Sequence, residues 1–320
     1  MKTLFTLLIV SLMSLTTYAQ KYCKDYVEYV THREALYNSQ DFAKITDLYK
    51  NVLSHKRVVK KFRVSDYYYA ASAYALSGNV NEAFTSINQL LKAFHYTDAN
   101  FLSDADFDSL KNDPRWNQIK TTIEGNIAKD KEKANNYAAI IKELEGIYNA
   151  DTTDRAAISG GFYDKPEEEK RQILKGVEKR DYERVAEVAS ILNQYGWLPE
   201  SIIGKNASSA LFLAIQHSDK KYIGRYLKLL KETALEGKAS LGNYATMEDR
   251  YRLMKGKKQI CSTQVVSEDK GQNYSFFQNK NKEKITFYRG WYDLAPLEQM
   301  LLITRMPEYR ETSKKWKDFN

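Results

Sequence analysis

Cysteine is scarce in this chain, and its scarcity excludes several kinds of site. The 320 residues contain two cysteines, Cys23 and Cys261. Two cysteines are too few for a disulfide scaffold, and no CxxC pair is present to hold zinc. A bridge between the two remains an alternative, which would require the N-terminus to dock on the second predicted domain.

The chain also lacks the common signatures of nucleotide and hydrolase sites. Neither GxxxxGK[ST] nor GxGxxG occurs, and GxSxG is absent too. Of the four histidines, only His217 lies in the second half of the chain, so a three-histidine zinc centre cannot form there. The other three are His32, His55 and His95. We therefore predict no metal and no cofactor.

Long apolar runs are absent except for one at the N-terminus. Residues 1–19 combine Lys2, an apolar run over residues 4–15 and the small residue Ala19, a pattern typical of a secretory signal peptide. The run is too short to span a membrane, because a spanning helix needs about 20 apolar residues. We expect cleavage after Ala19 and an exported protein, periplasmic or extracellular, that does not span the membrane. A buried N-terminal helix and a lipoprotein are the alternatives, although small residues do not immediately precede Cys23.

Basic residues are in excess, with 49 lysines and arginines against 41 acidic residues. Local basic clusters lie at residues 56–63, 255–258 and 314–317. Attraction to anionic surfaces or polymers is one interpretation, and a solvated basic surface is the other. No nucleic-acid-binding module is visible, so we expect no nucleic-acid partner.

Residues 20–125 are predicted to form a short helical array with a capping segment. Apolar and aromatic residues recur at three- and four-residue steps over residues 22–37 and 41–53. The next helix pair resembles a tetratricopeptide repeat, with motif positions filled by Tyr67, Ala70, Ala71, Tyr74, Gly78, Ala83, Ile87 and Leu90.

The first helix pair has Gln40 in the place of that turn glycine. Residues 101–116 resemble the cap of such arrays; a calcium site is disfavoured because the loop lacks the EF-hand glycine and terminal glutamate. The resemblance implies that a tyrosine-rich concave face binds an unknown protein or peptide.

Residues 126–320 are predicted to form a predominantly helical second domain with a few short strands or irregular segments. The fold class is therefore mainly α. Helices are expected at residues 127–148, 166–180, 182–195, 207–217, 220–236, 244–255 and 296–303, and short strands or irregular chain at 265–269, 274–277 and 285–288.

Isolated polar residues gather in this second domain. They include the catalytic candidates His217 and Asp219 and the ligand-binding candidates Asp154, Arg155, Asp249, Arg250, Gln259, Thr263 and Gln264. Together with Gly196-Trp197-Leu198-Pro199, Gly204, Arg289 and residues 294–297, their order resembles a family known as DUF6624, over roughly residues 140–302. The chain departs from the family pattern at Cys261-Ser262, where Tyr-Gly is more usual. The resemblance implies no activity.

Two interpretations of this polar group stay open. In the first, Asp219 turns back to orient His217, and Arg250 binds a carboxylate or phosphate in a polar pocket. In the second, the polar residues form a buried hydrogen-bond network that fixes the fold. We predict an exported protein- or peptide-binding protein with a polar pocket in its second domain. The alternative is a hydrolase with His217 as general base.

Overall fold

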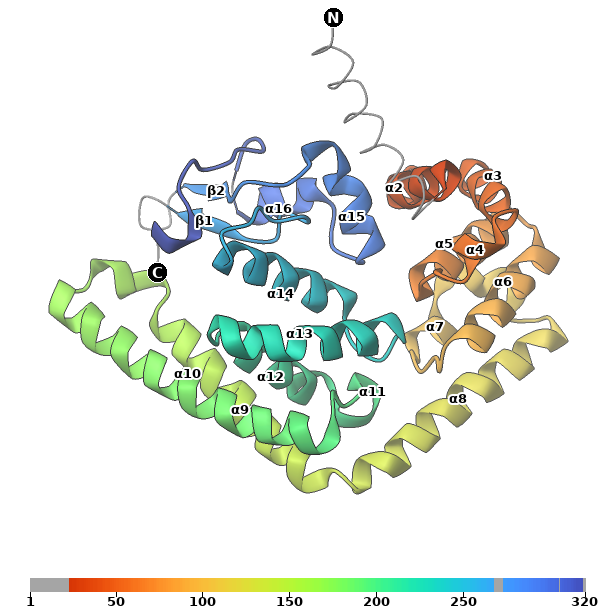
Figure 1. Ribbon diagram of the computed structural model, residues 1–320. Helices are drawn as coiled ribbons and strands as arrows, with labels where there is room; N and C mark the ends of the chain where they lie inside the picture. Colours follow the sequence, from red (N-terminus) through yellow and green to blue (C-terminus); the bar gives the residue numbers. More distant parts are fainter. Residues whose placement is uncertain (1–22, 268–272, 305, 319–320) are drawn as a thin grey trace, which may run out of the picture. The chain divides into compact units, whose positions relative to one another are not determined.

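The computed structural model describes residues 23–267, 273–304 and 306–318 (Figure 1). The predicted signal segment lies outside these residues. The chain divides into two compact units, residues 1–123 and 124–320. Both are mainly α-helical, which confirms the predicted fold class. Among the described helices, none has both the length and the apolar character needed to cross a membrane.

The first unit is built from helices that pack in consecutive pairs. Its elements are α2 (Lys24–Asn38), α3 (Phe42–Leu53), α4 (Lys56–Val59), α5 (Val64–Leu76), α6 (Val80–Ala93), α7 (Asn100–Ser103) and the 3-10 helix η1 (Ala105–Leu110), and α8 (Pro114–Asn135) continues into the second unit. Gly78 turns the chain between α5 and α6 with φ of +74°, and Gln40 adopts φ of +60° between α2 and α3. The two turns therefore share the left-handed conformation that was expected only of the glycine.

Small and aromatic residues fill the core of the first unit. Ala70 and Ala71 are fully buried, which lets α5 approach α6 closely. Several tyrosines contribute to this core. Tyr26, Tyr29 and Tyr49 are almost fully buried. They pack in the core because their rings pair with other aromatic rings and with each other.

A buried ion pair joins α2 to α5. Arg33 donates to the Asp66 carboxylate, and both side chains are almost fully excluded from solvent. The same carboxylate accepts hydrogen bonds from the Tyr26 hydroxyl at 2.8 Å and from the Arg63 backbone N–H at 2.7 Å. Since both oxygens of the buried carboxylate accept hydrogen bonds, the pair fixes how the two helices meet.

The second unit contains a bundle of longer helices and a small C-terminal region. Its elements are α9 (Ala138–Ala157), η2 (Gly160–Asp164), α10 (Glu167–Tyr195), α11 (Glu200–Ile203), α12 (Lys205–Gln216), α13 (Lys220–Leu235), α14 (Leu241–Met254), β1 (Val265–Ser267), β2 (Tyr274–Phe276), η3 (Lys282–Lys284), α15 (Ile285–Trp291), α16 (Leu297–Ile303) and η4 (Trp316–Asp318). Strands β1 and β2 pair antiparallel, with Val265 opposite Phe276.

Three local predictions differ from the structure. The helix predicted at residues 127–148 is interrupted at residues 136–137, between α8 and α9. Residues 285–288, expected to be a short strand or irregular chain, form the start of α15, in which Ile285 and Phe287 are buried. The two helices predicted at residues 166–195 are one continuous helix, α10.

The core of the second unit surrounds α12. Leu211 and Ile215 of α12 are fully buried against residues of α9, α10, α13 and α14. Trp197 and Leu198, just after α10, are also buried in this core. The packing places the C-terminal halves of α9 and α12 and the middle of α10 within reach of one another (Figure 1).

Candidate functional site

A loop in the second unit is closed around a buried carboxylate. Asp249 on α14 is fully buried, and its oxygens accept the backbone N–H groups of Ile260 at 2.6 Å, Cys261 at 3.1 Å and Thr263 at 3.2 Å. The Thr263 hydroxyl donates a further bond at 3.0 Å. Burial raises the pKa of Asp249, and these hydrogen bonds oppose that rise.

The amide side chains of the same loop are also internally satisfied. Gln259 is fully buried; it donates to the carbonyls of Gln264 and Phe277 and accepts from the Gln264 N–H at 3.0 Å. The Gln264 side chain donates to the Thr246 carbonyl at 3.2 Å. Arg289 donates to the carbonyls of residues 261 and 262. We call Asp249, Gln259, Thr263, Gln264 and Arg289 the loop lock.

The Cys261 thiol belongs to this loop and is buried. Burial raises its pKa well above the usual range for a thiol, so the nucleophilic thiolate is disfavoured. Both described cysteines, Cys23 and Cys261, are free thiols. The next residue, Ser262, takes φ of +54°, a conformation that favours glycine.

A second polar group surrounds His217, which caps the C-terminus of α12. Its Nδ1 lies 3.0 Å from Oδ1 of Asp151 on α9, 66 residues earlier in the chain. Asp219, which was expected to orient the ring, instead accepts the backbone N–H groups of Lys221 at 2.7 Å and Tyr222 at 3.1 Å. Asp219 is the N-cap residue of α13, which it directly precedes.

Asp151 is held in its ionised form. Burial alone raises the pKa of Asp151, but the hydrogen bond from His217 and the charges of His217 and Arg155 outweigh it, so the pKa is lowered. The His217 side chain is 21% exposed, whereas Asp151 is 3% exposed. The pair therefore presents an imidazole to solvent while its carboxylate stays inside.

Ion pairs connect α9 to α10 beside this histidine. Arg155 of α9 reaches Asp151 at 3.2 Å and also contacts Asp181 of α10. Arg184 bonds Asp154 at 2.7 Å and Asp181 at 2.5 Å.

Asp154 also forms an ion pair with a second arginine, Arg180. Arg180 bonds both of its oxygens, at 2.9 and 2.6 Å. These bonds lower the pKa of Asp154, chiefly through Arg180. Asp154 therefore belongs to a helix-to-helix contact in which both of its oxygens already accept hydrogen bonds.

Arg250 of α14 is the member of this neighbourhood without a counter-ion. Its guanidinium lies over the Trp316 ring, 5.0 Å from the centroid, and no carboxylate oxygen among the described residues lies within 4 Å of it. Its Nε is buried and makes no hydrogen bond. Burial and the nearby charge of Arg155 lower the pKa of Arg250 to about 10, and Asp181 opposes this only in part.

The charged cluster consists of His217, Asp151, Asp154, Arg155, Arg180, Asp181, Arg184 and Arg250. Ligand atoms of Asp151, Asp181 and His217 lie within 4.8 Å of one another, a spacing that suits a metal ion. However, Arg155 and Arg184 already bind those carboxylates. Four guanidinium groups in the cluster face three carboxylates, so its charge favours an anion over a cation.

The structure thus divides the predicted site residues between two places. His217, Asp154, Arg155 and Arg250 lie in the charged cluster, whereas Asp249, Gln259, Thr263 and Gln264 lie in the loop lock, and Asp219 in neither. Four further members of the charged cluster were not predicted from the sequence: Asp151, Arg180, Asp181 and Arg184. Their helical spacing was the available signal: Asp151 and Asp154 lie on one face of α9, as Arg180 and Arg184 do on α10.

One family matches the chain, described as "Family of unknown function (DUF6624)", over residues 138–306. The match runs from the start of α9 to just beyond α16, so it spans all residues of the loop lock and of the charged cluster. No curated protein and no solved structure matches the chain.

Substitution of Asp249 is expected to separate a structural role from a surface role. Asp249→Ala leaves three buried backbone N–H groups without an acceptor and should lower the free energy of unfolding of the second unit by ~3–5 kcal/mol. Asp219→Ala, the matched control, removes only an exposed helix cap and should cost ~1 kcal/mol. Urea denaturation of both variants measures the difference. Equal losses would show that the loop does not depend on Asp249.

Proposed function

Because the chain belongs to the family of unknown function DUF6624, whose name carries no activity, we propose a function from the charged cluster itself. The second unit binds an anionic group, a carboxylate or a phosphate, through Arg250 and Arg155. The bound group belongs to a small molecule or to a peptide.

The observation that carries this proposal is the uncompensated Arg250. A largely buried guanidinium without a counter-ion costs free energy, and the lowered pKa reports that cost. An anion removes the cost by supplying the missing charge. Guanidinium suits this role because its planar fork can donate two parallel bonds to a carboxylate or phosphate. Trp316 holds the group in place by stacking beneath it.

Arg155 supplies a further donor near Arg250, and His217 lies beside Arg155. Both share Oδ1 of Asp151 as an acceptor, so the two side chains lie next to each other. The Arg155 side chain is 30% exposed. It also contacts the carboxylate of Asp181, and this second contact fixes its orientation. A bound anion therefore meets positive groups whose positions are already set by α9 and α10.

Anion binding should appear as thermal stabilisation by inorganic phosphate. At equal ionic strength, phosphate should raise the melting temperature of the full chain relative to chloride, because it binds the folded state. Arg250→Met should abolish this increase without lowering the melting temperature in chloride, since the buried charge is gone. Differential scanning fluorimetry with acetate as a second probe measures both effects.

Arg225→Met is the matched control. Like Arg250, Arg225 lies over an aromatic ring, that of Tyr226, but Arg225 is exposed on α13. It should keep the full phosphate response. The proposal fails if phosphate stabilises the wild type and the Arg250 variant equally, or neither.

The second candidate function is hydrolysis with His217 as general base. One observation favours it: Asp151 holds Nδ1, which leaves Nε2 as the nitrogen that can accept a proton. In this arrangement Asp151, not Asp219, orients the ring. The nearby guanidinium groups would stabilise negative charge that develops on a substrate.

His217→Gln tests the hydrolytic alternative without removing the side-chain volume. If the chain cleaves small p-nitrophenyl esters or phosphates, this variant should lose at least about a hundredfold in rate, the usual contribution of a general base. Asp219→Asn should retain the wild-type rate, because Asp219 does not contact the ring. A wild-type rate no higher than that of His217→Gln removes the alternative.

We further propose that the protein is exported and that its first unit is a tetratricopeptide-like interaction array. The N-terminal charge and apolar pattern supports export, and the paired helices with left-handed turns at Gln40 and Gly78 support the array. An unknown protein or peptide would be its partner. Mass spectrometry of the exported chain should find an N-terminus at Gln20; an intact Met1 in that fraction would contradict the proposed cleavage.

A further inference from the structure

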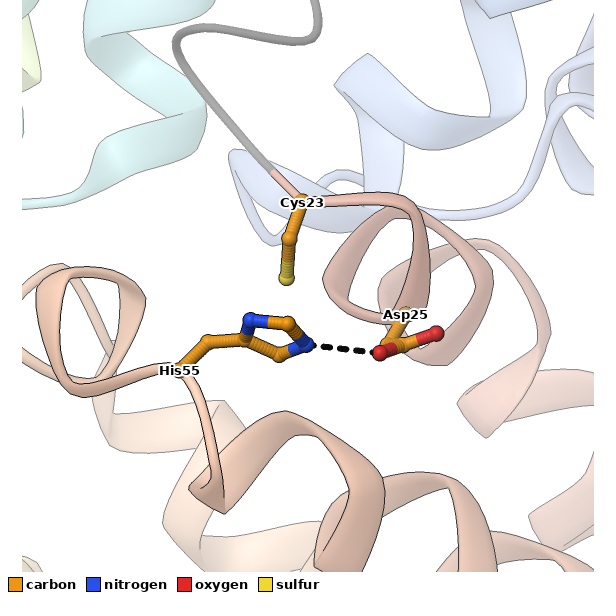
Figure 2. A group of neighbouring side chains, drawn as sticks. All are labelled: Cys23, Asp25 and His55. Carbon is orange, nitrogen blue, oxygen red and sulfur yellow. Dashed lines mark hydrogen bonds and ion pairs between the residues drawn. The ribbon is translucent and has the colours of Figure 1, made fainter.

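Three metal-ligating side chains converge in the first unit, far from the charged cluster in sequence (Figure 2). Cys23 directly precedes α2, and Asp25 lies in the first turn of that helix. His55 precedes α4, and its Nε2 lies 2.7 Å from Oδ2 of Asp25. The Cys23 sulfur points toward the ring of His55, and the Nε2 side of the ring faces Asp25.

The spacing of these groups matches what a small cation requires. One ligand atom from each residue lies within 4.8 Å of the other two. Zinc bonds of about 2.0–2.3 Å place two tetrahedral ligands roughly 3.5 Å apart, so modest side-chain rotations would close the site. All three residues are only partly buried, which leaves a path for the ion.

The charge around this group differs from that of the charged cluster. In the second unit, arginines occupy the carboxylates next to His217. In the first unit, His55 is the one ion-pair partner of Asp25 among the described residues, and a neutral imidazole can be a ligand. No lysine or arginine among the described residues has to be displaced from Asp25 before a metal binds.

We propose that Cys23, Asp25 and His55 form a binding site for a divalent transition metal of the zinc class. Thiolate, imidazole and carboxylate together are a donor set that zinc accepts, whereas calcium and magnesium prefer oxygen alone. Three protein ligands leave the fourth tetrahedral position for water or an outside ligand. Binding joins the start of α2 to the start of α4, which lie 30 residues apart at Asp25 and His55.

Cobalt(II) reports this site by its absorption spectrum. The full chain, reduced and stripped with EDTA, should bind one cobalt ion and show thiolate-to-cobalt charge transfer together with tetrahedral visible bands, and zinc should displace both. Cys23→Ser should remove the charge-transfer band. His55→Ala should remove the tetrahedral bands, and Asp25→Asn should weaken the affinity at least about tenfold.

Cys261→Ala and His32→Ala are the controls, because these residues lie outside the group of three. Both should keep the wild-type spectrum. Absence of the charge-transfer band, or its loss in Cys261→Ala and retention in Cys23→Ser, overturns the site.

Alkylation provides a measurement that needs no variant. Zinc should protect Cys23 of the wild-type chain from iodoacetamide, with the modified residue identified by peptide mass spectrometry. Rapid alkylation that zinc does not slow would show a reactive thiol beside His55 in place of a metal ligand, and would overturn the proposal.

Discussion

The second unit depends on one buried carboxylate and the backbone that it organises. Asp249 accepts hydrogen bonds from the backbone of Ile260, Cys261 and Thr263 in the loop after α14, so the loop cannot move away without leaving backbone groups unpaired. Gln259 accepts the backbone N–H of Gln264, and Arg289 donates to the backbone carbonyl of Cys261. These polar residues resemble a site in the sequence because both a site and a lock need isolated polar side chains within apolar segments.

Helix α14 connects this lock to the charged cluster. Asp249 and Arg250 are neighbours in sequence, and successive residues on a helix point about 100° apart. One side chain therefore enters the loop lock, and the next reaches the surroundings of Arg155 and Asp181. Because the lock fixes the rotation of α14, it also fixes where the guanidinium of Arg250 lies. The loop lock thus helps to position Arg250, the guanidinium without a counter-ion.

The helical character and most helix positions could be predicted from periodicity, because apolar spacing determines which face each helix buries. The site could be predicted only in part. Asp219 follows His217 by two residues, but its carboxylate caps α13. His217 instead contacts Asp151, which lies on α9. Partners 66 residues apart depend on how α9 and α12 pack, which local patterns do not specify. Residues 285–288, expected to be a short strand or irregular chain, begin helix α15, since β propensity depends strongly on tertiary context.

The difference between Asp154 and Arg250 decides which predicted residues are candidates for binding. Both are charged, both are more than half buried, and both lie in the same cluster. Asp154 has two guanidinium partners and a lowered pKa, so a ligand would have to break bonds to reach it. Arg250 has a pKa shifted against its charged form, so a ligand anion would relieve a cost already present in the fold. This difference in charge compensation is why the proposed anion site is placed at Arg250 and not at Asp154.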